Sequence, residues 1–193
     1  MIPWEHLGDA DIPGDGGQLS LFRRDREYSL RLERVELMNS RMHESEEELA
    51  RAAIDAHEAP RRVLIGGLGM GFTLRAALDL LPMEARVTVA ELVPEVVDWN
   101  HRFLGDLSGR PLDDGRVQVT VADVAAVMQR SHGTFDLILL DTDNGPEGTS
   151  AEANERLYQA AGLAEAVAAL RPGGVLAVWS AFPSRAFTDR LAR

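Results

Sequence analysis

The chain has 193 residues and a formal net charge of −11, which suits one domain with a small addition. This charge disfavours nucleic acid as a partner and suits a small neutral or cationic substrate. Cysteine is absent, which excludes disulfides and cysteine-ligated metals, and the histidines show no ligand spacing, so we expect no metal site. No apolar run is long enough to span a membrane and no signal peptide is evident, so we expect a cytoplasmic protein without a membrane partner.

Residues 1–44 are predicted to form an N-terminal arm and a β-hairpin. Residues 9–18 are rich in Gly, Asp and Pro, which is typical of a loop or a poorly ordered arm. Apolar residues alternate between Leu19 and Leu37 on both sides of a polar turn, which predicts the hairpin. Ser45-Glu46-Glu47-Glu48 then indicates a capping box that opens a helix to about Glu58.

From residue 63 onward, short apolar strands alternate with segments of helical spacing. Strands are predicted at Val63–Ile65, Arg86–Glu91, Val117–Ala122, Phe135–Leu140 and Val175–Trp179, and helices at Phe72–Leu81, Pro94–Phe103, Val124–Arg130 and Ser150–Leu170. This alternation predicts an α/β fold with a parallel sheet that is covered by helices on both faces.

Candidate binding residues follow the carboxyl ends of four successive strands, which is where parallel sheets bind ligands. A Gly-rich turn, Gly67 to Gly71, lies between the first strand and its helix. Glu91 ends the second strand at a spacing that suits ribose hydroxyls, while Asp123 and Asp141 follow the third and fourth strands. Each acid alone could cap a helix, but together they predict a site for a nucleotide-like ligand.

Several motifs add a family resemblance to this reasoning. They are His57–Ile65, Thr73–Arg75, Glu91–Val97, Phe135–Asp141, Leu157-Tyr158 and Leu170–Val175. With the strand-end acids, they look like the class I S-adenosylmethionine-dependent methyltransferase fold, and within it most resemble the spermidine synthase (aminopropyltransferase) family, over roughly residues 45–180. The resemblance implies a Rossmann-like fold preceded by a β-hairpin, with residues 45–193 as a nucleotide-binding, methyltransferase-like domain.

The resemblance also implies which residues hold the donor, S-adenosylmethionine or its decarboxylated form. The Gly-rich turn would cradle the methionine-like end, Glu91 would bind the ribose, and Asp123 with the Val124 amide would bind adenine. The cofactor-binding set is Gly67, Leu68, Gly69, Gly71, Glu91, Leu92, Asp123, Val124 and Asp141. Asp141 would also act catalytically, beside the sulfonium and the incoming amine.

The chain departs from the family pattern at three places. Met70 stands where the family has an aspartate that binds the amine of the decarboxylated donor, and Ser45-Glu46-Glu47 stands in place of its Tyr-His-Glu acceptor motif. Asp143 lies one position before the family's second acid and is our second catalytic candidate. Glu46, Glu47 and Trp179 are the candidates for binding the acceptor, which we expect to be a small molecule such as a cationic amine.

Loss of the acid at Met70 removes a group that would repel the carboxylate of ordinary S-adenosylmethionine. The sequence therefore slightly favours methyl transfer to a small amine or hydroxyl acceptor. Two alternatives stay open: aminopropyl transfer from the decarboxylated donor to a polyamine, and a non-catalytic nucleotide-binding or partner subunit. A NAD-dependent dehydrogenase is a weaker candidate, because the acids after strands three and four would have no role in it.

The sequence after Trp179 is too short for the two strands that usually complete a class I methyltransferase sheet, so we expect these strands to be absent. The fifth strand would then be a free edge that has to be covered. We expect it to pair with a second subunit, which gives a homodimer, or to be covered by the N-terminal segment.

Overall fold

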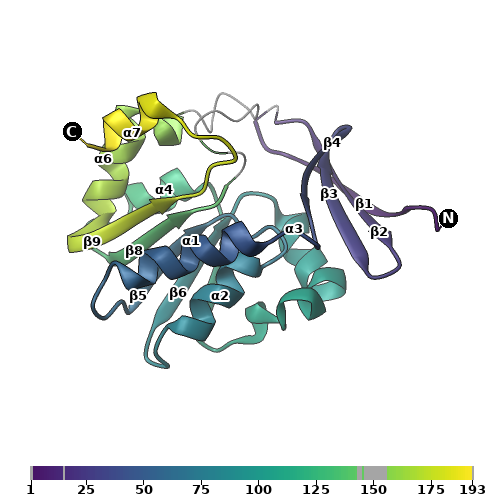
Figure 1. Ribbon diagram of the computed structural model, residues 1–193, viewed down its shortest axis with the longest axis horizontal. Helices are drawn as coiled ribbons and strands as arrows, with labels where there is room; N and C mark the ends of the chain where they lie inside the picture. Colours follow the sequence, from purple (N-terminus) through teal and green to yellow (C-terminus); the bar gives the residue numbers. More distant parts are fainter. Residues whose placement is uncertain (1, 15, 143–144, 146–155, 193) are drawn as a thin grey trace.

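The computed structural model describes residues 2–14, 16–142, 145 and 156–192. The described residues form a four-stranded antiparallel sheet near the N-terminus and a five-stranded parallel sheet flanked by helices (Figure 1). No helix in this part of the chain is long and apolar enough to cross a bilayer.

The N-terminal sheet contains more strands than the sequence predicts. Its strands are β1 (Glu5–Asp11), β2 (Gln18–Arg24), β3 (Glu27–Leu32) and β4 (Val35–Asn39), in that spatial order. The arm predicted at residues 9–18 is therefore wrong in part, since β1 extends to Asp11 and pairs with β2. Ala10 is the one fully buried residue of β1, so this strand lacks the apolar alternation by which a strand is recognised.

The parallel sheet confirms the predicted α/β fold. Its strands are β5 (Arg62–Gly66), β6 (Arg86–Glu91), β7 (Val117–Val121), β8 (Phe135–Leu140) and β9 (Leu170–Val178), in the order β7-β6-β5-β8-β9. Every residue of β8 is buried, which explains its continuous apolar run, because both faces of the sheet are covered. β9 begins earlier than predicted, since Leu170 already pairs with Phe135 of β8.

Helices cover both faces of this sheet. They are α1 (Glu44–Asp55), α2 (Phe72–Leu80), α3 (Pro94–Trp99), α4 (Val124–Gln129), α6 (Ala160–Ala169) and α7 (Arg185–Leu191). Residues of α1, α2 and α3 share one core with the N-terminal sheet, and residues of α4, α6 and α7 form the other. Within β8, Leu137 and Leu139 belong to the first core while Ile138 and Leu140 belong to the second, as strand alternation requires.

The capping box predicted at Ser45–Glu48 is wrong. The helix begins earlier, with His43 as the N-cap and no side-chain capping bond. Ser45 lies in the first turn, where its hydroxyl donates to the Glu46 carboxylate. The ring of His43 stacks on Phe72 with the centroids 4.2 Å apart, so the start of α1 contacts a distant part of the chain.

β9 lies at one edge of the parallel sheet, and the described residues contain no strand beyond it. The N-terminal sheet lies at the other side of the molecule (Figure 1). Coverage of β9 by the N-terminal segment is therefore wrong, and pairing with a second subunit stays a prediction. Residues 150–155 of the helix predicted at Ser150–Leu170 lie outside the described residues, and its later part forms α6.

Candidate active site

A cavity of about 400 Å³ lies between the carboxyl ends of the parallel strands and the N-terminal sheet. The predicted site residues that line it are Glu46, Gly67, Gly69, Glu91, Leu92, Asp123, Val124, Asp141 and Trp179. Leu68, Gly71 and Glu47 are not part of the lining, and Asp143 lies outside the described residues. The structure thus brings the strand-end residues to one place.

The Gly-rich turn runs between β5 and α2, and its conformation requires glycine. Gly67 has a φ of +91°, and a Cβ atom there would lie 2.1 Å from the carbonyl oxygen of Asp141. Gly71, the N-cap of α2, has a φ of +84°, and a Cβ atom there would lie 2.9 Å from the Ser108 hydroxyl. Side chains are thereby excluded at these two positions, and Gly67 presents bare backbone to the cavity.

Glu91 is held at the end of β6 by backbone amides. Its carboxylate accepts hydrogen bonds from the Leu68 amide at 2.8 Å and from the Val93 amide at 2.9 Å. Burial raises the pKa of Glu91, and these amides oppose the rise. The backbone of Leu92 and Gly69 also lowers this pKa, and because Glu91 lines the cavity, its ionised carboxylate can face adjacent hydroxyls of a ligand.

Asp123 is the N-cap of α4 and also lines the cavity. Its Oδ1 accepts a hydrogen bond from the Ala125 amide at 2.8 Å. The cap employs one oxygen and fixes the orientation of the carboxylate, so Oδ2 can accept from an exocyclic amine. The two interpretations of this aspartate, as a helix cap and as a ligand contact, are compatible.

Asp141 follows β8 and is fixed by a hydroxyl that sequence analysis did not assign. The Thr73 Oγ1 donates to Asp141 Oδ2 at 2.5 Å, and Thr73 is buried in the first turn of α2. Thr73 belongs to one of the motifs that carry the family resemblance. However, Thr73 and Asp141 lie far apart in the sequence, and no local pattern predicts their contact. The carboxylate is therefore oriented before any ligand arrives.

Two further residues that sequence analysis missed support the Gly-rich turn from behind. The Asn100 side-chain amide donates to the Gly69 carbonyl at 2.8 Å and to the Val96 carbonyl at 2.9 Å. The Ser108 hydroxyl donates to the Met70 carbonyl at 3.0 Å. Both side chains are buried. The sequence offers one signal for Asn100: it is a polar residue four positions after the apolar Val96, on the side of the helix that is expected to face the core.

On the acceptor side, the predicted residues separate. Glu46 is buried and lines the cavity, whereas Glu47 lies outside the lining with its Oε1 2.8 Å from the Nδ1 of His43. Trp179 lines the cavity, and its amide donates to the Leu140 carbonyl at 2.9 Å. Met70 is fully buried in the core and is absent from the lining.

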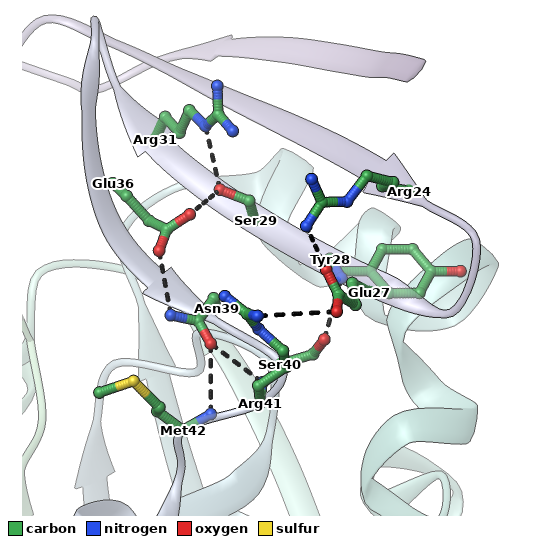
Figure 2. A network of polar contacts seen from close by, with 10 residues as sticks. All are labelled: Arg24, Glu27, Tyr28, Ser29, Arg31, Glu36, Asn39, Ser40, Arg41 and Met42. Carbon is green, nitrogen blue, oxygen red and sulfur yellow. Dashed lines mark hydrogen bonds and ion pairs between the residues drawn. The ribbon is translucent and has the colours of Figure 1, made fainter. Parts of the chain in front are cut away.

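The N-terminal sheet also contributes to the cavity, which the sequence did not indicate. Figure 2 shows the polar network that fixes the connection from β4 to α1. Asn39 Oδ1 accepts from the amides of Arg41 and Met42 at 3.0 and 3.2 Å, and Asn39 Nδ2 donates to Glu36 at 3.0 Å. Asn39 and Met42 line the cavity, so this network positions one of its walls.

No group of acidic and histidine side chains within the described ranges could hold a metal ion.

Comparison with known proteins places the chain in a family. Residues 42–183 match the spermine/spermidine synthase domain. Polyamine aminopropyltransferase 2 of Pseudomonas aeruginosa is 32% identical over 134 residues, which cover 67% of this chain and 36% of the relative. The polyamine aminopropyltransferase of a Ruegeria species is 32% identical over 137 residues, covering 71% and 46%. Putrescine N-methyltransferase 1 of Nicotiana tabacum is 36% identical over 119 residues, covering 61% and 30%.

Solved structures agree in fold. A spermidine synthase in complex with the transition state analogue AdoDATO gives a TM-score of 0.75 at 22% identity, covering 90% of this chain and 57% of that one. The spermidine synthase of Thermotoga maritima gives 0.71 at 21% identity, covering 90% and 55%. The chain spans about a third to a half of the length of the curated relatives described above. The domain match covers most of the chain, and the chain belongs to the spermine/spermidine synthase family.

Proposed function

We propose that the cavity binds S-adenosylmethionine or its decarboxylated form and that the bound alkyl group is transferred to a small cationic amine. One observation carries this proposal: the Gly-rich turn, Glu91, Asp123 and Asp141, which follow four different strands, all line one cavity. In this assignment Glu91 binds the ribose hydroxyls, Asp123 and the Val124 amide bind adenine, and the turn accommodates the sulfonium end.

A sulfonium is already an activated alkyl donor, so the protein mainly has to align a neutral amine with the carbon under attack. Such alignment can contribute about 7–11 kcal/mol of the barrier in favourable cases. Asp141 is suited to accept the proton of the incoming ammonium, because its carboxylate lines the cavity and the Thr73 hydroxyl fixes its orientation. Glu46 supplies a second carboxylate that attracts a cationic acceptor.

Aminopropyl transfer is the preferred reaction, because relatives at 32% identity are named polyamine aminopropyltransferases. The names of these relatives favour aminopropyl transfer, whereas the sequence pattern by itself slightly favours methyl transfer. Methyl transfer is the second candidate for two reasons. A relative at 36% identity is named a putrescine N-methyltransferase, and the buried Met70 presents no acid to the donor.

Calorimetric titration with S-adenosylmethionine, its decarboxylated form and methylthioadenosine tests the donor. Preference for the decarboxylated form supports aminopropyl transfer, and preference for S-adenosylmethionine supports methyl transfer. Failure to bind any of the three contradicts the proposal. Binding without turnover over a panel of amines, followed by mass spectrometry, would favour a non-catalytic subunit instead.

Asp141→Asn is the companion variant. It should reduce turnover by about a hundredfold or more while most of the donor affinity remains. Asp98→Asn is the matched control, because Asp98 is an exposed carboxylate on α3 that pairs only with Arg102 in the contacts described. Equal turnover in both variants would contradict the role of Asp141.

We also propose that the chain forms a homodimer through the edge of β9, because the described residues place no strand beyond it and an unpaired strand edge tends to pair with another strand. Size-exclusion chromatography with light scattering measures the mass directly. A stable monomer over a wide concentration range would contradict this assembly.

A further inference from the structure

Trp179 follows the edge strand of the parallel sheet and lies beside Asp141. Leu140 pairs with Val178 in the β8–β9 ladder, so the residues that follow them, Asp141 and Trp179, are neighbours. Strand alternation places both side chains on the face opposite to Leu140 and Val178, and the bond from Thr73 of α2 to Asp141 agrees with this placement. Trp179 packs against the core that α1, α2 and the N-terminal sheet share, and it lines the cavity.

The order of the strands separates the sides of the cavity. The donor is assigned mainly to residues that follow β5, β6 and β7, whereas Trp179 follows β9. The strand between these two groups is β8, which Asp141 follows. The donor therefore occupies one side of Asp141, and the side at Trp179 is left for the acceptor.

The ring of Trp179 suits a cation. Trp179 is the one aromatic residue in the described lining, which contains four carboxylates and no arginine, lysine or histidine, and such a lining attracts cations. The face of an indole ring attracts a cation within about 6 Å of its centroid. Trp4 shows this contact within the chain, since the guanidinium carbons of Arg24 and Arg31 lie 4.5 and 5.2 Å from its ring centroid. Among the described residues, no arginine stacks on the ring of Trp179 in this way.

We infer, on the basis of the proposed function, that the indole face of Trp179 binds an ammonium group of the acceptor amine next to Asp141. This contact requires no oxygen of the neighbouring carboxylates, of which Asp141 and Glu46 already accept hydrogen bonds from Thr73 and Ser45. These hydroxyl donors are neutral, so the carboxylates keep their charge and attract the same cation over a longer distance. Trp179 thereby distinguishes a cationic amine from a neutral molecule of the same shape.

Calorimetry with 1,4-diaminobutane on the protein saturated with methylthioadenosine tests this contact. Trp179→Leu keeps an apolar side chain without a ring, and the Kd for the diamine should rise by about five- to thirtyfold. Trp179→Phe keeps a ring face and should raise the Kd by about threefold or less. Tryptophan with four fluorine atoms on its benzene ring, introduced at position 179 alone, keeps the shape of the side chain but removes the negative potential of its face. Its effect on the Kd should match that of Trp179→Leu.

Trp4→Leu is the matched control, because Trp4 does not line the cavity, and its Kd for the diamine should stay within about twofold of the unmodified value. An unchanged Kd in the fluorinated protein would overturn the inference, because the ring would then act through its shape alone. This comparison decides the question even if Trp179→Leu does not fold. A change in affinity for S-adenosylmethionine without a change for the diamine would assign the ring to the sulfonium and would also overturn the inference.

The two levels of failure can be distinguished by the affinity for methylthioadenosine, which carries no positive charge at sulfur. This affinity should be the same in all the variants at position 179. Absence of methylthioadenosine binding to the unmodified protein would contradict the proposed function itself. Binding of methylthioadenosine without any binding of the diamine would overturn both the inference and the proposed cationic acceptor.

Discussion

Replacing Asn100 by leucine should weaken donor binding, although this side chain lies behind the Gly-rich turn and not in the cavity lining. Asn100 is 2% exposed, and its amide donates to the carbonyls of Gly69 and Val96. Leucine is similar in size, so the substitution mainly removes these two bonds. The Val96 carbonyl keeps the backbone amide of residue 100 as a partner, whereas the Gly69 carbonyl loses the bond that holds the turn.

The expected magnitude follows from this difference. A buried carbonyl that loses its partner costs about 1–3 kcal/mol. The Oδ1 of Asn100 has no hydrogen-bond partner among the described residues, and its removal offsets about 1 kcal/mol of that cost. We expect the free energy of unfolding to fall by about 1–2 kcal/mol. Because Gly69 lines the cavity, we expect the Kd for methylthioadenosine to rise by about tenfold.

Urea unfolding measures the first quantity and calorimetry with methylthioadenosine measures the second. His101→Leu is the matched control, because His101 is the exposed neighbour of Asn100, and both quantities should stay near their unmodified values. A loss of stability in Asn100→Leu with the Kd unchanged within about twofold would refute the argument that this side chain positions the turn.

Three further predictions concern other parts of the molecule. Burial raises the pKa of Glu91 above its ordinary value of 4.5, and only the ionised form accepts both ribose hydroxyls, so affinity for methylthioadenosine should fall as the pH drops through a value above 4.5. This pH dependence should vanish in Glu91→Gln. If the pH dependence persists in that variant, another group causes it. The bidentate contact with Arg116 lowers the pKa of Asp114 from 3.8 to about 2. The ionised Asp114 therefore stabilises the folded state fully above pH 3.8, and this contribution is lost as the pH falls toward 2. Asp114→Asn should therefore lower the free energy of unfolding by about 1–2 kcal/mol at pH 7, with a gap that narrows in acid, and a gap constant with pH in urea unfolding would exclude this cause. Gly67→Ala should lower the free energy of unfolding by about 3 kcal/mol or more, because the new Cβ would meet the Asp141 carbonyl. Gly133→Ala is the control: Gly133 has a φ of +55° but open space around it, so this variant should cost only about 1 kcal/mol. Equal thermal stability of the two variants would contradict the steric argument.

The parallel sheet and its acids could be predicted because they depend on local signals. Strands buried on both faces need continuous apolar runs, and β8 has six buried residues in succession. Parallel strands also place their carboxyl ends at one edge, so acids that directly follow strands must lie near one another. Glu91, Asp123 and Asp141 line one cavity for this reason.

The parts that could not be predicted depend on contacts between distant segments. β1 is held by pairing with β2 rather than by an apolar pattern of its own. The N-cap of α1 is His43, whose ring stacks on the distant Phe72, and no local capping pattern reveals this contact. Asn100 forms its functional contact with Gly69, 31 positions away, and single-residue polarity in a helix does not identify such a partner.

The glycines themselves carry less information about a ligand than their pattern suggests. Gly69 has a φ of +51°, and a Cβ atom there would lie 2.9 Å from the sulfur of Met38 on β4. Gly67 is excluded from carrying a side chain by the backbone of Asp141. The backbone of Asp141 therefore suffices to require glycine at position 67, with or without a bound donor, whereas at position 69 only the positive φ and the movable end of the Met38 side chain oppose a side chain. Three strand-end carboxylates that line one cavity, Glu91, Asp123 and Asp141, are the stronger indication of a nucleotide-like ligand. Backbone amides favour the ionised form of Glu91 against the effect of burial on its pKa, which keeps a carboxylate at the cavity for hydrogen-bond donors that arrive with a ligand.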